Sequence, residues 1–314
     1  MPKQKVLTII GPTASGKTDF AFHTAQLLKE KYNKEVEIIS ADSRQVYKHI
    51  PVATAQPPEE FLNKTRHHFI SELELNEEFN AGEFGKKGRE IIQKLLSENK
   101  IPMVTGGSGL YINSLIYGLF ENDDARDFPG EDKKKTVRSE LNKRLAEEGV
   151  EKLFAELKSI DPLTAAEMIN ITGRRVIRAL EAFYVTGIPI SSLRNDKIEI
   201  NFEPVIIGLL WDRKKLYDRI NKRVEHMIET GLVKEIEILK EKGYNYKDCN
   251  SLNTVGAREV FDYFDRKISY NRMIELIKQN TRRYAKRQMT WFRRDGNIRW
   301  IEVDRNFQDL ESLI

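Results

Sequence analysis

The 314-residue sequence predicts an α/β fold: a doubly wound parallel sheet built around a phosphate-binding loop, with a helical insertion. Two observations carry this prediction. The sequence GPTASGKT occupies residues 11–18, directly after an apolar run at 6–10. Short apolar runs then alternate with segments of helical periodicity, as expected when each strand is followed by a crossover helix.

The candidate strands are short apolar runs, at residues 6–10, 36–40, 101–109, 204–211 and 298–303. They end in small or polar residues, which is typical of a parallel sheet whose ligand crevice lies at the carboxyl ends of its strands. Helices of the same domain are expected at 19–31, 213–228, 232–242 and 271–293.

Residues 120–200 have a different character, polar and rich in helix formers, which predicts a helical insertion in the α/β core. Within 174–187 the helical spacing predicts one apolar face, made by Val176, Ile177, Leu180 and Tyr184. Gly187 and Pro189 are expected to end that helix. The predicted domains are therefore a core of 1–119 with 201–314, and an insertion of 120–200.

The composition is that of an ordinary soluble chain, with 32% charged and 40% hydrophobic residues and a net charge of +4. Cys249 is the only cysteine, which excludes an intrachain disulfide and a zinc–thiolate cluster. The first apolar run lasts five residues and leads straight into the loop, so no signal peptide is expected. No run approaches the length of a membrane span. We expect a cytoplasmic monomer without a membrane partner.

The glycine-rich loop is expected to hold a polyphosphate. Its two glycines let the backbone N–H groups point into one concavity, Lys17 adds a positive charge, and Thr18 offers a hydroxyl to a bound Mg²⁺. A chance match to a glycine-rich turn is the alternative, which the strand–loop–helix context disfavours. The loop alone does not distinguish a kinase from an ATPase or another enzyme. Its residues are Gly11, Pro12, Thr13, Ala14, Ser15, Gly16, Lys17 and Thr18.

Two further segments are expected at the same edge of the sheet. ADSRQVY, residues 41–47, follows the second strand, so Asp42 should lie near the loop. That carboxylate suits either a water-mediated magnesium contact or a general base, and a turn or N-cap is the structural alternative. GGSGLY, residues 106–111, supplies a second glycine-rich turn, from which Ser108 could donate to a phosphate oxygen.

A basic segment lies near the end of the chain. Residues 282–294, RRYAKRQMTWFRR, combine arginine and lysine with three interleaved aromatic residues: Tyr284, Trp291 and Phe292. Basic groups beside stackable rings suit a nucleic-acid surface. A solvated helix face is the alternative for a charge run of this kind.

The segments GPTASGKT, ADSRQVY, RHHFI, GGSGLY, RRVIRALE and RRYAKRQMTWFRR resemble, in this order and at fitting spacings, the tRNA dimethylallyltransferase family over roughly residues 5–300. The resemblance implies a prenyl transfer in which the loop holds a diphosphate that departs. Dimethylallyl diphosphate would be the donor, and N6 of the adenosine on the 3′ side of the anticodon (position 37) in tRNA would be the acceptor. A tRNA anticodon stem–loop is the implied partner and Mg²⁺ the implied cofactor.

The resemblance also implies roles for individual residues. Lys17, the loop N–H groups and Mg²⁺ on Thr18 would neutralise the leaving diphosphate. Ser108 would bond near its bridging oxygen, where the family more often has threonine. Asp42 would accept the N6 proton. Arg219 matches a family arginine that faces the diphosphate, although a surface role is the alternative.

The implied RNA contacts follow from the same resemblance. The target base must be unpaired and extruded for its N6 to be reached. The insertion would grip the stem, and the basic helix would bind phosphates. The alternative is that at least one arginine of the RRVIR segment only forms an ion pair with Glu181 and does not contact RNA. The implied tRNA-binding residues are Asp42, Ser43, Arg44, Gln45, Arg174, Arg175, Arg178, Arg258, Arg283 and Arg287.

Several positions depart from the family pattern. Ala257 stands where a larger or aromatic residue is usual, which puts stacking or packing against RNA there in doubt. Gln56 replaces a common lysine and Ser71 a common aspartate. His67 and His68 are not expected to bind metal, because adjacent strand residues point to opposite faces. We expect the chemistry to stand and RNA preference to be the property that changes.

Three rival functions share part of this pattern. A small-molecule P-loop kinase or ATPase explains the loop and Asp42, but leaves the basic helix and the insertion without purpose. A prenyltransferase acting on free adenine nucleotides shares the diphosphate chemistry and differs only in its acceptor. A catalytically silent tRNA-binding paralogue agrees with the altered RNA-side motifs and disagrees with the complete set of catalytic side chains.

Overall fold

A computed structural model describes residues 3–118, 131–193 and 198–303 of the chain. The chain divides into two compact units. One unit is formed by 1–116 together with 200–314, and the other by 117–199. The second unit is thus inserted into the first, at positions close to those expected from the change in composition. Each unit has its own core and is described by itself.

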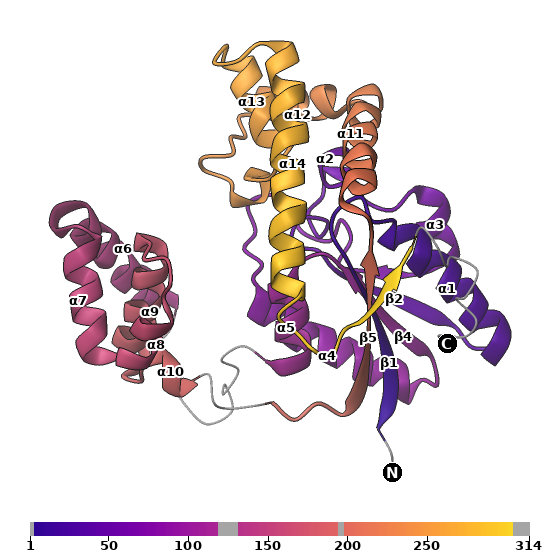
Figure 1. Ribbon diagram of the computed structural model, residues 1–314, viewed down its shortest axis with the longest axis horizontal. Coiled ribbons are helices and arrows are strands. Elements are labelled where there is room, and N and C mark those ends of the chain that lie inside the picture. The colour runs from indigo at the N-terminus through magenta and orange to yellow at the C-terminus, as the bar shows by residue number, and fades with distance from the viewer. Residues whose placement is uncertain (1–2, 119–130, 194–197, 304–314) are drawn as a thin grey trace. The chain divides into compact units, whose positions relative to one another are not determined.

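The first unit contains a six-stranded sheet of order β3-β2-β4-β1-β5-β6, in which every neighbouring pair is parallel (Figure 1). This confirms the α/β fold with a doubly wound parallel sheet. The strands are β1 (Gln4–Ile10), β2 (Val36–Ala41), β3 (His67–His68), β4 (Ile101–Gly106), β5 (Phe202–Leu210) and β6 (Arg299–Glu302). In the register, Gly106 lies beside both Ile10 and Ala41. The carboxyl ends of β1, β2 and β4 are therefore aligned at the same edge of the sheet.

The helices of the first unit follow the strands in an alternating order. They are α1 (Lys17–Tyr32), α2 (Pro51–Thr54), α3 (Glu59–Lys64), α4 (Ala81–Ser97), α5 (Gly109–Tyr117), α11 (Arg213–Glu229), α12 (Leu232–Glu241), α13 (Ala257–Phe264) and α14 (Tyr270–Phe292), with a 3₁₀ turn at Asn250–Leu252. The chain passes from β1 out to β2 and then back to β4, so right-handed crossovers place α1 and α4 on opposite faces of the sheet. Helices α11 and α14 pack against each other (Figure 1).

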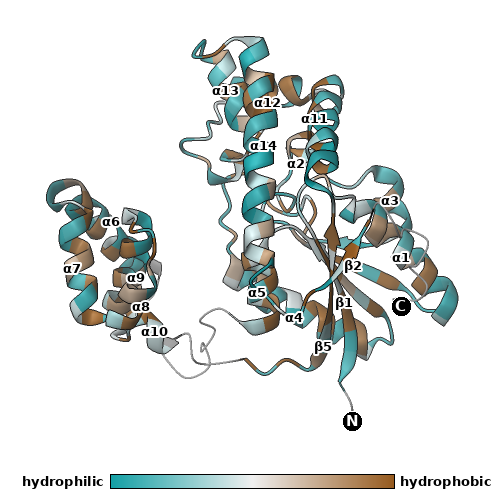
Figure 2. Ribbon diagram, in the orientation of Figure 1, coloured by the Kyte–Doolittle hydropathy of each residue, from teal (hydrophilic) through white to brown (hydrophobic). Residues whose placement is uncertain are grey.

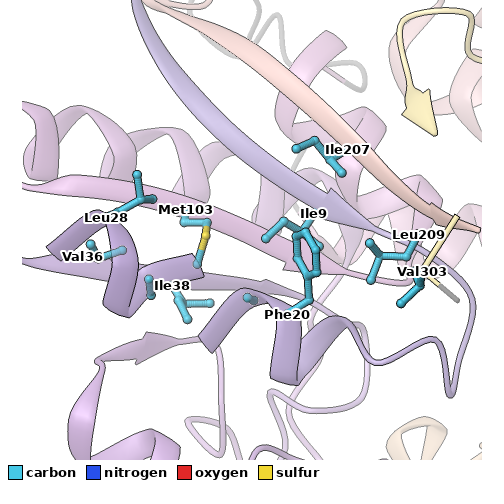
Figure 3. Packing of buried hydrophobic residues seen from close by; sticks show 11 residues of the cluster. Ile9, Phe20, Leu28, Val36, Ile38, Met103, Ile207, Leu209 and Val303 are labelled. Carbon is cyan, nitrogen blue, oxygen red and sulfur yellow. The ribbon is translucent and has the colours of Figure 1, made fainter. Parts of the chain in front are cut away.

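The main core lies between α1 and one face of the sheet. Ile9, Ile38, Met103 and Ile207 come from four different strands and pack with Phe20 of α1 (Figure 3). Each is at most 2% exposed, and burying a side chain of this size stabilises the fold by about 1.5–3 kcal/mol. Figure 2 shows the matching pattern, with hydrophobic residues along the central strands and mostly hydrophilic residues along α11 and α14.

The second unit is helical, with α6 (Glu131–Glu148), α7 (Val150–Ile160), α8 (Pro162–Glu167), α9 (Gly173–Thr186) and α10 (Ile190–Leu193). Val176, Ile177 and Leu180 of α9 are buried in its core, as their spacing predicts. Tyr184, four residues after Leu180 on the same face, is 40% exposed, and its hydroxyl donates to Glu156 of α7. Gly187 ends α9 in the left-handed conformation, as expected.

Within the three described stretches, no helix combines the length and the apolar composition that crossing a membrane requires.

Candidate active site

A cavity of about 340 Å³ opens at the carboxyl ends of the central strands. It is lined by the phosphate-binding loop, the segment after β2, the turn after β4, and one face each of α11 and α14. Side chains that are far apart in the sequence therefore share one site, in the crevice position typical of this fold. Of the residues predicted from the sequence, the cavity brings together Thr13, Lys17, Thr18, Asp42, Ser43, Arg44, Gln45, Arg258 and Arg287.

The phosphate-binding loop is a tight turn between β1 and α1. Gly16 has φ +85°, a conformation that side chains with a Cβ rarely adopt. At Gly11 a Cβ would lie 2.8 Å from Ser15 Oγ and 3.3 Å from Leu209 O, so a side chain there would require Ser15 to move. The loop is closed by a hydrogen bond from Ser15 N to Pro12 O of 3.2 Å. Because α1 begins at Lys17, an anion in the loop also meets a helix N-terminus.

Lys17 folds back over its own loop, with Nζ donating to Pro12 O at 2.8 Å. Burial, with a contribution from the charge of Arg223, lowers the pKa of Lys17 to about 7, while Asp42 acts in the opposite direction. A diphosphate in the loop would favour the protonated ammonium through its negative charge. Lys17 is thus held beside the loop in a cationic environment that suits a polyanion.

Asp42 directly follows β2 and lines the cavity. Its Oδ1 accepts a hydrogen bond from Arg44 N at 2.9 Å, which fixes the turn that carries the side chain. The turn role that the sequence left open is therefore real. It engages one carboxylate oxygen and is compatible with a chemical role for the other.

Ser108 joins the turn after β4 to the segment after β2. Its Oγ accepts from Ser43 N at 3.1 Å, and its own backbone N donates to Ala41 O at 3.2 Å. Tyr284 of α14 lies near the same hydroxyl. Burial and the nearby Asp42 raise the pKa of Tyr284 to about 12, so the phenol is neutral at ordinary pH. Ser108 itself is not among the residues that line the cavity, whereas the preceding Gly106 and Gly107 are.

The two arginines of α11 near the loop have different surroundings. Arg219 donates from Nε to Ala14 O at 2.9 Å and stacks over the Trp211 ring at 4.4 Å, so it supports the loop at Ala14. Arg223, one turn later on the same helix, lines the cavity. Burial lowers the pKa of Arg223, and Asp42 opposes that shift. The sequence interpretation gave Arg223 no role, although its position one turn after Arg219 on an amphipathic helix was the available signal.

The arginines of α14 and of the 250–258 region that were predicted to bind RNA also differ in whether they line the cavity. Arg287 lines the cavity, whereas Arg283 is exposed and donates to Asn280 Oδ1 at 3.4 Å. Arg258 is exposed at the cavity, and Arg44 Nη1 donates to Asn250 O at 2.6 Å. Gln288 and Tyr284 of α14 also line the cavity, and the sequence interpretation assigned neither a role in it.

Arg174, Arg175 and Arg178 belong to α9 of the second unit, where all three are exposed and line a groove beside α8. Arg178 forms an ion pair with Glu181 at 3.3 Å, so the structural alternative applies to this residue. Glu181 is 2% exposed, and Arg138 also holds it, through two hydrogen bonds of 2.9 Å.

The family pattern implies a magnesium ion, and the donor set fits one. Thr18 and Asp42 line the same cavity, and Mg²⁺ is usually held by one or two protein groups together with substrate phosphates and water. Among residues 3–118, 131–193 and 198–303, no group of three or more His, Cys, Asp or Glu side chains is placed to hold a metal by itself. His68 Nε2 contacts Glu37 at 2.7 Å and His67 Nδ1 contacts Thr65 O at 2.8 Å, which are structural contacts.

The departures from the family pattern have clear positions. Ala257 is fully buried at the start of α13, so its side chain faces the core. The difference from the larger residue usual in the family therefore concerns packing inside the protein at this position. Ser71 Oγ donates to Gln56 Oε1 at 2.9 Å, so two departures contact each other. Gln56 Nε2 in turn donates to Gln45 O at 2.9 Å and to Tyr47 O at 3.2 Å.

The parallel sheet, the strand–loop–helix unit and the carboxylate-bearing cavity beside it place the protein among the P-loop α/β enzymes. The model of the IPP transferase family matches residues 45–295, and the chain belongs to this family. It is 44% identical to the tRNA dimethylallyltransferase of Acetivibrio thermocellus, over 98% of this chain and 95% of that one. It is 41% identical to the tRNA dimethylallyltransferase of Salinibacter ruber, over 94% and 87%.

Solved structures give the same result. The full-length tRNA isopentenylpyrophosphate transferase of Bacillus halodurans is 36% identical, with a TM-score of 0.69 over 99% of this chain and 94% of that one. A eukaryotic dimethylallyltransferase acting on tRNA is 26% identical, with a TM-score of 0.79 over 98% and 75%. The fold and the family therefore agree across both comparisons.

Proposed function

We propose that this enzyme transfers the dimethylallyl group of dimethylallyl diphosphate to N6 of adenosine 37, beside the anticodon of tRNA, and releases diphosphate. The observation that carries the proposal is the composition of one cavity. It combines a phosphate-binding loop, the carboxylate of Asp42, and arginines from α11 and α14. A loop for the leaving group and a base for the acceptor are the two parts that this reaction needs.

The leaving group would be held by the loop N–H groups and by Lys17. Charge grows on the diphosphate as the C1–O bond breaks, and donors aimed at that charge typically contribute about 3 kcal/mol each. Arg223 lies in the same cavity and adds a second fixed cation. Mg²⁺, when bound by Thr18 and the diphosphate oxygens, would supply further charge neutralisation. Arg219 would contribute to diphosphate binding indirectly, because its hydrogen bond to Ala14 O holds the loop in place.

The acceptor would be activated by Asp42. The N6 lone pair forms a bond to C1 of the dimethylallyl group, the electrons of the C1–O bond leave with the diphosphate, and the N6 proton passes to Asp42. This proton becomes acidic as the new bond forms, so an ordinary carboxylate suffices. Arg44 N–H holds one carboxylate oxygen and so orients the side chain for this transfer.

The RNA would reach the cavity as an extruded base. A stacked or paired adenine hides N6, whereas an unpaired anticodon loop can present it. Arg287 and Arg258 stand at the cavity and would bind the flanking phosphates. The exposed arginines of α9 would bind the RNA through the insertion. We expect the protein to act as a monomer in the cytoplasm.

Mass spectrometry tests the proposal directly. The purified protein is incubated with Mg²⁺, dimethylallyl diphosphate and either an unmodified stem–loop with adenosine 37, the same stem–loop with inosine 37, or AMP. A prenyl gain on the adenosine stem–loop alone is expected, because inosine lacks the exocyclic amine. A gain on AMP would move the acceptor to free nucleotides. No gain on any acceptor, together with stem–loop binding in an anisotropy titration, would favour the silent paralogue. Phosphate transfer in a parallel incubation with ATP would favour a kinase.

A further inference from the structure

The carboxamide of Gln288 lies buried where three segments of the first unit meet. Its Oε1 accepts a hydrogen bond from Thr13 N of the phosphate-binding loop at 2.8 Å. Its Nε2 donates to Gly107 O, in the turn after β4, at 2.8 Å. The side chain is 7% exposed. One residue of α14 therefore connects the loop of the diphosphate site to the turn that carries Ser108.

The turn is shaped to admit α14. A Cβ at Gly107 would lie 2.4 Å from Gln288 Nε2, and a Cβ at Gly109 would lie 2.2 Å from Trp291 Cδ1. Tyr284, one turn before Gln288, lies near Ser108, the residue between these two glycines. The spacing 284, 288, 291 places all three side chains on one face of the helix. The 107–109 turn is thus packed along its whole length against a single face of α14.

The two hydrogen bonds of Gln288 need a side chain that is both donor and acceptor. A carboxamide has an acceptor oxygen and a donor NH₂ group, whereas a carboxylate lacks the donor, an ammonium lacks the acceptor, and a thioether replaces neither well. Pro12 has no N–H and the N–H of Thr13 is bonded to Gln288. Ser15 N donates to Pro12 O, so the N–H groups that remain for phosphate are those of Ala14 and of the residues from Gly16 onward. Their position depends on where the loop begins.

We propose that Gln288 is a positioning residue for the diphosphate site, which fixes the start of the phosphate-binding loop relative to the 107–109 turn. The inference rests on the proposed function for the identity of the ligand. A donor misplaced by about 1 Å is enough to weaken a preorganised site strongly. Losing Gln288 should therefore act on the leaving group first and leave RNA affinity nearly intact, although the residue lies on an RNA-binding helix.

Gln288→Met and Gln279→Met form a matched pair of variants. Methionine keeps the approximate volume of Gln288 without its hydrogen bonds. Gln279 is half-exposed on the same helix, about two and a half turns earlier and so on the opposite face. The readouts are the Kd of inorganic diphosphate with Mg²⁺ by calorimetry, the Kd of the stem–loop by fluorescence anisotropy, and kcat and KM for prenyl transfer.

We expect Gln288→Met to weaken diphosphate binding about tenfold and to lower kcat by a similar factor, as for the loss of buried hydrogen bonds at a preorganised site. The Kd of the stem–loop should change less than about twofold, and Gln279→Met should behave as wild type. Unchanged diphosphate binding would overturn the proposal, and so would an equal loss of RNA affinity. Diphosphate binding is measured without an acceptor, so the result stands even if no prenyl transfer to RNA is found.

Gly107→Ala tests the same contact without replacing Gln288. The new Cβ would displace the carboxamide, so the substitution should weaken diphosphate binding in the wild-type background. In a Gln288→Ala background the space is free, and Gly107→Ala should then have little further effect. Equal losses in both backgrounds would overturn the proposal. This cycle also covers the case in which Gln288→Met fails to fold.

Discussion

At the scale of single residues, Asp42 shows how one side chain combines a structural and a proposed chemical role. One carboxylate oxygen accepts from Arg44 N and shapes the turn after β2, while the side chain lines the cavity. A carbonyl oxygen would serve the turn equally well. Only a carboxylate can also take a proton, and the two roles can be separated by substitution.

Asp42→Asn keeps an acceptor for Arg44 N but removes the base, whereas Asp42→Ala removes both. We expect each variant to lower kcat by about 10²–10⁴-fold, the usual contribution of general base catalysis. The stem–loop Kd should stay near the wild-type value for Asp42→Asn. Single-turnover prenyl transfer and anisotropy measure the two quantities. Near-normal turnover in Asp42→Asn would remove Asp42 as the base.

Gln56 and Ser71 provide a second prediction at the residue scale. Their hydrogen bond replaces the lysine and aspartate that are more usual in the family, and Gln56 holds the backbone at Gln45 and Tyr47. Gln56→Lys and Ser71→Asp should each destabilise the fold alone, since each introduces an unpaired charge. The double variant should recover about 1 kcal/mol of coupling. Urea denaturation of all four proteins measures this coupling, and simple additivity would contradict it.

At the scale of elements, α14 carries the predicted RNA-binding cations. The structure distinguishes them, because Arg287 lines the cavity, whereas Arg283, one turn earlier in the helix, is exposed and is not among the cavity-lining residues. Arg282 instead donates to Asn221 of α11 at 2.7 Å and helps to hold the two helices together. A run of basic residues thus divides into members that hold helices together and members that line the cavity.

Replacing Arg283 and Arg287 together by alanine should weaken stem–loop binding and reduce the slope of log Kd against log salt by about one to two units. The single Arg287→Ala variant should account for most of the loss at the catalytic cavity. Arg272→Ala, in the first turn of α14 and ion-paired with Glu275, serves as the control. Anisotropy titrations at several salt concentrations give the slope. An unchanged slope in the double variant would place the RNA elsewhere.

The junction of β2, β3 and β4 depends on a buried carboxylate. Glu37 of β2 is 5% exposed and accepts hydrogen bonds from Lys100 at 2.9 Å and His68 at 2.7 Å. Burial tends to raise its pKa, but these two hydrogen bonds outweigh burial and hold the pKa of Glu37 below its ordinary value of 4.5. The stabilisation is therefore complete above pH 4.5 and is lost as the pH falls through the folded-state pKa.

Glu37→Gln should flatten the acid side of the stability profile, because glutamine does not titrate. Glu37→Ala should lower the free energy of unfolding at pH 7 by about 1–3 kcal/mol, the cost of leaving buried partners without an acceptor. Denaturation at a series of pH values from 7 down to 3 measures both effects. A wild-type protein with the same pH profile as Glu37→Gln would show that Glu37 does not contribute this acid sensitivity.

The sequence predicted four helices of the first unit closely and missed elements such as α4, α13 and β3, although α4 and α13 are clearly amphipathic. Helices α1, α11, α12 and α14 lie within two residues of their predicted bounds. The sequence interpretation did not include α4, although Asn80 and Glu83 form a capping box at its start and mark it in the sequence. Strand β3 has two residues, which is too short for any periodic pattern.

At the scale of the whole molecule, the predicted site was incomplete for a topological reason. Lys17, Thr18 and Asp42 could be placed together because strand–loop units of a parallel sheet meet at one edge. Arg223 and Gln288 come from helices about 200 or more positions further along the chain. No local pattern states that these helix faces turn toward the loop. The strand order β3-β2-β4-β1-β5-β6 has the same non-local origin.

The pairing of β1 with β5 joins residues that are made at very different times. Ile10 lies beside Gly208 and Gln4 beside Phe202, with the insertion between them in the chain. At a synthesis rate of roughly 5–20 residues per second, β5 is synthesised about 10–40 seconds after β1. The insertion has a separate core, so its folding does not require β5 to be present. The central sheet, in contrast, can close only after the whole insertion has been synthesised.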